Sequence, residues 1–133
     1  MIVLDTHALV WWVSDPAQIP AKSRRLIEQA AEQTGSLAVS CISIWEVAML
    51  VAHRRLELTI SVETWLAALQ SLPSLNFVPI DNSIAIRAVS LPSFPHKDPA
   101  DRFIVSTVLE VGATLVTADR RLRGYKQIAT VWD

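Results

Sequence analysis

Hydrophobic residues along this chain form short continuous runs that alternate with longer segments of helical character. The runs typical of strands are residues 1–4, 36–41, 75–80, 114–117 and 127–131. The segments predicted as helices are residues 8–14, 20–33, 43–54, 62–71, 82–91, 98–111 and 119–123. Short apolar strands that alternate with helices are typical of a parallel sheet covered on both faces. The pattern predicts an α/β fold, a single-domain α/β/α sandwich with a short, mostly parallel central sheet.

Polar residues at the predicted helix ends suggest how several helices begin and end. Thr6 is expected to cap the first helix, and Ser43-Ile-Trp-Glu46 has the spacing of a capping box. Asp98 precedes Pro99, which suits the first helical position, and Gly112 is expected to end that helix.

The composition limits the class of protein. The chain has 133 residues, of which 51% are hydrophobic and 19% charged, with a formal net charge of -1. This length and hydrophobic content favour one domain, residues 1–133, and exclude a disordered chain or a globally basic nucleic-acid binder. The single cysteine, Cys41, excludes an internal disulfide. No targeting or membrane-spanning segment is recognisable, so we expect a soluble, cytoplasmic protein with no membrane partner.

Acidic residues follow two of the predicted strands. Asp5 follows the first strand, and Asp119 follows residues 114–117. Ligands of open parallel sheets bind at the carboxyl ends of strands. Aspartate also often caps helices and forms turns, and position alone does not separate these two interpretations.

Three further acids lie on predicted helices. Glu46 would complete the capping box, but its helix is apolar on every face, so its carboxylate needs a partner or a metal. Asp101 shares a helical stripe with Ile104 and Val108 and is therefore predicted to point inward. For Asp98 we favour the role of helix cap over that of ligand.

Inward-facing acids without inward-facing bases repel one another, and a divalent cation would remove this conflict. A ligand set made only of carboxylate oxygens suits Mg²⁺ or Mn²⁺ rather than zinc. Sites of this kind commonly support in-line displacement at phosphorus.

Four segments, in this order, resemble the PIN-domain family, specifically the VapC-type toxins of bacterial type II toxin–antitoxin pairs. They are Ile2-Val-Leu-Asp-Thr-His-Ala-Leu9, Ser43-Ile-Trp-Glu46, His96-Lys-Asp-Pro-Ala-Asp-Arg102 and Leu115-Val-Thr-Ala-Asp119. The resemblance implies a Mg²⁺-dependent endoribonuclease that cuts single-stranded regions of RNA and is neutralised by a cognate antitoxin. It also implies products with 5′-phosphate and 3′-hydroxyl ends, formed by metal-activated water.

The resemblance also assigns residues. It places Asp5, Glu46, Asp101 and Asp119 in the catalytic, metal-binding set and makes Asp98 a further candidate ligand. Contacts with substrate RNA are expected from Thr6, Arg102, Thr117 and Arg120. His7 and His96 are close enough in sequence to these acids to support them, although packing or capping is the more ordinary role. Four arginines are instead expected on exposed helix faces: Arg24, Arg25, Arg54 and Arg55.

The apolar helices suggest protein partners. Trp11 and Trp12 are adjacent, so one helix face cannot bury both, and the segment 44–51 is apolar all round. With the resemblance, this favours a homodimer that also binds an antitoxin segment in an apolar groove. Two alternatives remain open: a PIN-like module that binds RNA or protein without cutting, and another Mg²⁺-dependent phosphoryl hydrolase. A haloacid dehalogenase-type phosphatase would need a second acid at His7.

Overall fold

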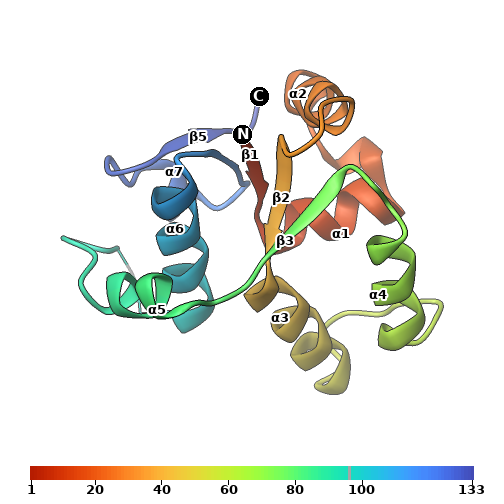
Figure 1. Ribbon diagram of the computed structural model, residues 1–133. Helices are drawn as coiled ribbons and strands as arrows, with labels where there is room; N and C mark the ends of the chain where they lie inside the picture. Colours follow the sequence, from red (N-terminus) through yellow and green to blue (C-terminus); the bar gives the residue numbers. More distant parts are fainter. Residues whose placement is uncertain (96) are drawn as a thin grey trace.

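A computed structural model describes residues 1–95 and 97–133, so the role expected of His96 lies outside the described residues. A five-stranded sheet with the order β3-β2-β1-β4-β5 forms the centre of this described part (Figure 1). The strands are β1 (Ile2–Leu4), β2 (Leu37–Ser40), β3 (Leu75–Val78), β4 (Thr114–Val116) and β5 (Ala129–Val131). All four pairings are parallel, which confirms the predicted α/β class.

Helices lie on both sides of this sheet (Figure 1). Helices α5 (Asn82–Val89), α6 (Pro99–Val111) and α7 (Arg120–Arg123) lie on one side. Helices α1 (Thr6–Ser14), α2 (Ala21–Ala31) and α4 (Val62–Gln70) lie on the other, with a 3₁₀ turn, η1 (Pro16–Gln18), after α1. Helix α3 (Cys41–Ala52) continues from the end of β2.

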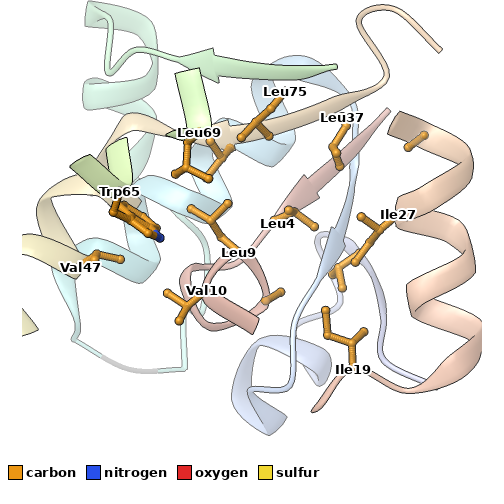
Figure 2. Packing of buried hydrophobic residues seen from close by; sticks show 14 residues of the cluster. Leu4, Leu9, Val10, Ile19, Ile27, Leu37, Val47, Trp65, Leu69 and Leu75 are labelled. Atoms are coloured by element: carbon orange, nitrogen blue, oxygen red, sulfur yellow. The ribbon is translucent and has the colours of Figure 1, made fainter. Parts of the chain in front are cut away.

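Alternate residues of the central strands are buried in two separate cores. Leu4 of β1 and Val116 of β4 belong to the core under α1, α2 and α4, which also contains Trp65 and Leu69 (Figure 2). Their neighbours Val3 and Leu115 belong to the core under α6 and α7. Because successive strand residues point to opposite faces, a wholly apolar strand is what burial on both faces requires.

Two helices begin before the predicted residue. Helix α1 begins at Thr6 and is capped by Asp5, whose Oδ1 accepts from the Thr6 amide at 2.8 Å. Helix α3 begins at Cys41, and its cap is Ser40, whose hydroxyl accepts from the Ile42 amide at 3.2 Å. The predicted Thr6 cap and Ser43 capping box were therefore wrong. In both cases a polar residue directly at the strand end begins the helix earlier.

Helix α6 matches its prediction closely. Its N-cap is Asp98, with Pro99 in the first turn, and it ends at Gly112 in the left-handed conformation, at φ 67°. Glycine adopts this conformation without the steric penalty of a Cβ atom. None of the described helices is both long and apolar enough to cross a membrane.

Candidate active site

The sheet order places the carboxyl ends of β1 and β4 side by side. From β1 the chain adds β2 and then β3 on one side of the sheet. It then returns to add β4 on the other side of β1, so the strand order reverses between β1 and β4. Such points are the usual ligand sites of open α/β sheets. Asp5 follows β1 and Thr117 follows β4, and the Thr117 hydroxyl donates to Asp5 Oδ2 at 2.6 Å. The same hydroxyl accepts from the Asp119 amide at 3.1 Å, so Thr117 connects two of the predicted acids.

Helix α3 brings Glu46 to the same edge. Thr6 Oγ1 donates to Ser43 Oγ at 2.9 Å, which fixes the first turn of α3 against the start of α1. Both hydroxyl residues are buried. Glu46 lies one turn after Ser43 and lines a cavity together with Asp5. The helix start at Cys41 leaves Glu46 outside any capping box, so its carboxylate is available to this cavity.

The start of α6 supplies two more acids. Asp98 Oδ1 accepts from the Ala100 amide at 3.0 Å, as expected of a helix cap. Asp101 follows in the first turn, and only 8% of its surface is exposed. Both line the cavity with Asp5 and Glu46, so Asp98 is at once a cap and a wall of this cavity.

One cavity thus collects all five predicted acids from the ends of β1 and β4 and from α3 and α6. Its volume is about 360 Å³, and its charged or polar lining residues are Asp5, His7, Glu46, Arg55, Asp98, Asp101, Asp119 and Arg121. Asp119 also caps α7 by accepting from the Arg121 amide at 2.8 Å. Asp5, Asp98 and Asp119 therefore each cap a helix and line the cavity.

Burial raises the pKa values of three carboxylates in this cavity, those of Asp101, Asp5 and Glu46. Burial is the largest cause for Asp101, whose pKa is raised from 3.8 to about 8, and the charges of Asp5, Asp98, Glu46 and Asp119 raise it further. Burial also raises the pKa of Asp5, against the hydrogen bonds from Thr117 and the Thr6 amide. The pKa of Glu46 is raised by burial too, while a hydrogen bond from Thr6 lowers it. Acidic groups whose pKa values are strongly raised are typical of functional sites when they lie in a cleft.

The donor set of the cavity fits a hard divalent cation. Its acidic ligands are all carboxylates, the type that Mg²⁺ and Mn²⁺ prefer, and their mutual repulsion would be relieved by positive charge. Within the described residues, no three acidic, histidine or cysteine side chains stand close enough together to hold one ion as placed. Binding would therefore require these side chains to rotate toward the ion.

Several residues expected to contact RNA are placed elsewhere. Thr6 and Thr117 are 1% and 0% exposed, so they position the acids and cannot reach a substrate. The Arg102 guanidinium donates to the Ala88 carbonyl at 3.1 Å and lies 5.0 Å from the Phe94 ring centre. Arg120 lines a different hollow from the acids. Arg102 is thus directed toward Ala88 and Phe94 and does not line the cavity that Asp101 lines.

Two arginines outside the set expected to contact RNA line the cavity, namely Arg55 and Arg121. Arg121 lies in it and pairs with Asp119, with Nε 3.7 Å from Oδ1. Arg55 was expected on an exposed helix face, but α3 ends before it. Arg54 adopts φ 57°, and the Arg55 amide donates to the Leu50 carbonyl at 2.8 Å, which forms a Schellman motif that turns the chain back. No glycine marks this turn, so the sequence carries no signal for it.

Comparison with known proteins now decides the family. The family model described as PIN domain matches residues 2–128. The chain belongs to the PIN-domain family. Among curated proteins, it is 41% identical over 133 residues to Ribonuclease VapC22 of Mycobacterium tuberculosis (strain ATCC 25618 / H37Rv), with 98% of each chain covered.

Solved structures of this family share the fold. VapBC2 from Rickettsia felis, bound to a DNA fragment from its promoter, matches with a TM-score of 0.73 and 20% identity over 100% of both chains. DNA-bound VapBC from Salmonella typhimurium matches with a TM-score of 0.69 and 18% identity, covering 98% of this chain and 96% of that one. FitAcB from Neisseria gonorrhoeae matches with a TM-score of 0.65 and 21% identity, covering 98% of this chain and 96% of that one. These PIN-domain structures agree with the parallel sheet described above.

Proposed function

We propose that this PIN-domain protein is a metal-dependent endoribonuclease toxin that cuts single-stranded regions of RNA and is neutralised by a cognate antitoxin. The observation that carries the proposal is the single cavity lined by Asp5, Glu46, Asp98, Asp101 and Asp119. The likeness to a protein named Ribonuclease VapC22 over nearly the whole chain supports the reaction type. The likeness to VapBC complexes supports an antitoxin partner, and the reducing cytoplasm is the expected location.

We expect Asp5, Glu46, Asp101 and Asp119 to hold Mg²⁺ or Mn²⁺, with Asp98 as a further candidate. When bound, such an ion would lower the pKa of an attacking water and offset charge on the scissile phosphate. Thr117 holds Asp5 through a hydrogen bond of 2.6 Å, so that Asp5 keeps one orientation toward the cavity. In the metal-free protein Asp101 has a pKa of about 8, so binding of the cation would displace its proton near neutral pH.

Cationic side chains in the same cavity suit the substrate. Arg55 and Arg121 lie among the acids, where they would attract RNA phosphates that the carboxylates alone would repel. When an RNA phosphate enters, Arg121 would exchange the Asp119 carboxylate, 3.7 Å away, for the phosphate. Both arginines are therefore proposed substrate-binding residues.

The test is cleavage of a labelled single-stranded RNA by the purified protein. We expect cutting with Mg²⁺ or Mn²⁺, none with EDTA, and 5′-phosphate ends on the products. Asp101→Asn should abolish cutting while its circular dichroism stays native-like. Asp15→Asn, an exposed acid outside the cavity, is the matched control and should cut normally. RNA binding without metal-dependent cleavage would instead indicate a non-cutting module.

An apolar groove is the proposed antitoxin site. A hollow of about 780 Å³ lies between the second half of α1, residues 56–60 and α4, and its walls include Trp11, Trp12 and Leu69. Trp65 also lines it, and the Trp65 Nε1–H is buried with no acceptor among the described residues. A buried donor without a partner is unfavourable, so a backbone carbonyl of a bound segment would stabilise it. Trp65→Phe should then weaken antitoxin binding, measured by calorimetry.

We also propose a homodimer. The two apolar helices named from the sequence are only partly exposed, but Trp45 on α3 is 55% exposed. On α5, Ile86 and Val89 lie one turn apart and are 73% and 82% exposed. Large apolar side chains on one exposed face commonly mark an interface. Sedimentation at tens of micromolar tests this, and a monomer would contradict the dimer without affecting the nuclease proposal.

A further inference from the structure

A second hollow, here called the α7 pocket, is lined by the residue that directly follows Asp119 in the chain. Its volume is about 350 Å³, and α7 and the last strand line it with Arg120, Arg123, Gly124, Thr130, Val131, Trp132 and Asp133. Asp119 and Arg121 line the acidic cavity, whereas Arg120 and Arg123 line the α7 pocket. Asp119 and Arg120, which are neighbours in the chain, therefore line different hollows. The volume of the α7 pocket is within the range of small-ligand sites.

Two arginines give the α7 pocket positive charge. Arg120 and Arg123 are exposed and lie one turn apart on α7. In the part of the chain that the structure describes, neither forms an ion pair, whereas Arg121 pairs with Asp119. Asp133 is the pocket's acidic side chain, and its Oδ2 lies 3.6 Å from Lys22 Nζ. The two guanidinium groups are therefore available to an anion, and arginine suits a phosphate.

Aromatic rings connect this pocket with the acidic cavity. His7 lines the cavity, and its ring centre lies 5.8 Å from that of Trp11. The Trp11 ring centre lies in turn 5.7 Å from that of Trp132, which lines the α7 pocket. A row of three rings thus runs from the acids to the two arginines. Aromatic side chains beside a cationic groove are the usual platform for unpaired bases.

Trp132 is held in place from both sides. Before it, the Val131 carbonyl accepts from the Thr117 amide at 3.3 Å, and β5 pairs with β4. After it, the Asp133 carbonyl accepts from the Ser23 amide at 2.8 Å and from the Ser23 hydroxyl at 3.2 Å. A ring fixed before a ligand arrives loses little conformational entropy on binding.

We infer that the α7 pocket is a subsite for one nucleotide of single-stranded RNA, adjacent to the nucleotide cut at the acids. Arg120 and Arg123 hold its phosphate, and its base stacks on Trp132. The inference rests on the proposed ribonuclease function, because the aromatic row leads from the proposed cutting site. It also gives a physical reason for a single-stranded substrate, since a paired base has no free face to offer a ring.

The experiment measures binding separately from cutting. Affinity for a fluorescent single-stranded RNA is titrated at several salt concentrations in the Asp101→Asn background. Adding Arg120→Gln and Arg123→Gln should weaken binding by about tenfold or more. It should also reduce the slope of log affinity against log salt by about 0.7, as expected for one phosphate contact on a single strand.

Further variants separate the ring from the charges. Trp132→Ala should weaken binding by about fivefold or more, with an unchanged salt slope, and Trp132→Phe should restore most of it. The control variant, Arg25→Gln with Arg87→Gln, removes two positive charges outside both hollows. It should change neither the affinity for RNA nor the salt slope. Thermal melts confirm that each variant is folded.

The outcomes distinguish the two proposals. Wild-type affinity and salt slope in the Arg120→Gln, Arg123→Gln protein would overturn the subsite and leave the nuclease proposal intact. An equal loss in the Arg25, Arg87 control would also overturn it. RNA binding that depends on Arg120, Arg123 and Trp132 in a wild type that does not cut would overturn the nuclease and retain the subsite.

Discussion

Replacing Asp101 with asparagine should change how stability depends on pH. In the folded protein, Asp101 holds its proton up to a pKa of about 8, mainly because of burial and then because of four neighbouring carboxylates. In the unfolded chain it releases the proton near its ordinary value of 3.8. Between these values the folded state binds more protons than the unfolded state, so rising pH favours unfolding. The stability that this group contributes is complete below about pH 4 and is lost as pH rises toward 8.

The size of the effect follows from the pKa difference. One pKa unit corresponds to about 1.4 kcal/mol, so Asp101 alone lowers the free energy of unfolding by roughly 4 kcal/mol between pH 5 and pH 8. For a chain of 133 residues, this corresponds to a Tm decrease on the order of 10–15 °C. The raised pKa values of Asp5 and Glu46 act in the same direction.

The assay is thermal unfolding in EDTA between pH 5 and pH 8, at constant ionic strength. We expect the wild type to lose Tm across this range, and Asp101→Asn to lose less than half as much. Asp15→Asn, at an exposed position, should behave as the wild type does. Because Mg²⁺ is expected to bind the ionised carboxylates, it should reduce the wild-type loss, by about 2.7 kcal/mol at a hundredfold excess over Kd. A wild-type Tm that rises with pH, or an Asp101→Asn slope equal to the wild-type slope, would refute the reasoning.

Three further changes test other parts of the site. Thr117→Val removes the hydroxyl that donates to Asp5, and should lower the free energy of unfolding by about 1–3 kcal/mol and reduce RNA cleavage; full activity at unchanged Tm would contradict this. Asp5→Asn should respond less than wild type to Mg²⁺ in thermal melts, and an equal response would mean that Asp5 is not a ligand. Arg54→Gly removes a side chain held at φ 57° and should raise the unfolding free energy in urea by about 1 kcal/mol, whereas Arg54→Ala should not.

The strand and helix order was predictable because it depends on local patterns. Short apolar runs alternate with helical segments, and every predicted strand and helix is present with small shifts at its ends. Asp98, Pro99 and Gly112 mark the two ends of α6 through backbone chemistry that needs no tertiary contact. The starts of α1 and α3 were missed because Asp5 and Ser40 end a strand and cap a helix at once.

The acidic residues were also recognisable in advance, but only as candidates. Local features identified the acids one at a time, such as a position at a strand end or, for Asp101, a place on the inward-facing stripe of a helix. The resemblance to the PIN-domain family assigned them to one site. Their meeting in one cavity depends on the strand order, which pairs β4 with β1 although β1 ends at Leu4 and β4 begins only at Thr114.

 The two strands come from opposite ends of the chain, and their parallel pairing brings them side by side. No local pattern specifies that pairing.

What the sequence alone determined is therefore the α/β class, the ends of α6 and the identity of the five acids, because periodicity, capping and strand-end position are properties of neighbouring residues. Tertiary structure decided which side chains share a cavity. It placed Arg120 and Arg121 in different hollows, and it directed Arg102 toward Ala88 and Phe94 rather than into the cavity. It also brought Arg55 to the acids through a left-handed turn at Arg54. Thr6 and Thr117 are buried, and their hydroxyl groups position neighbouring side chains of the site through hydrogen bonds. These outcomes depend on the packing of elements distant in the chain, which no local sequence pattern encodes.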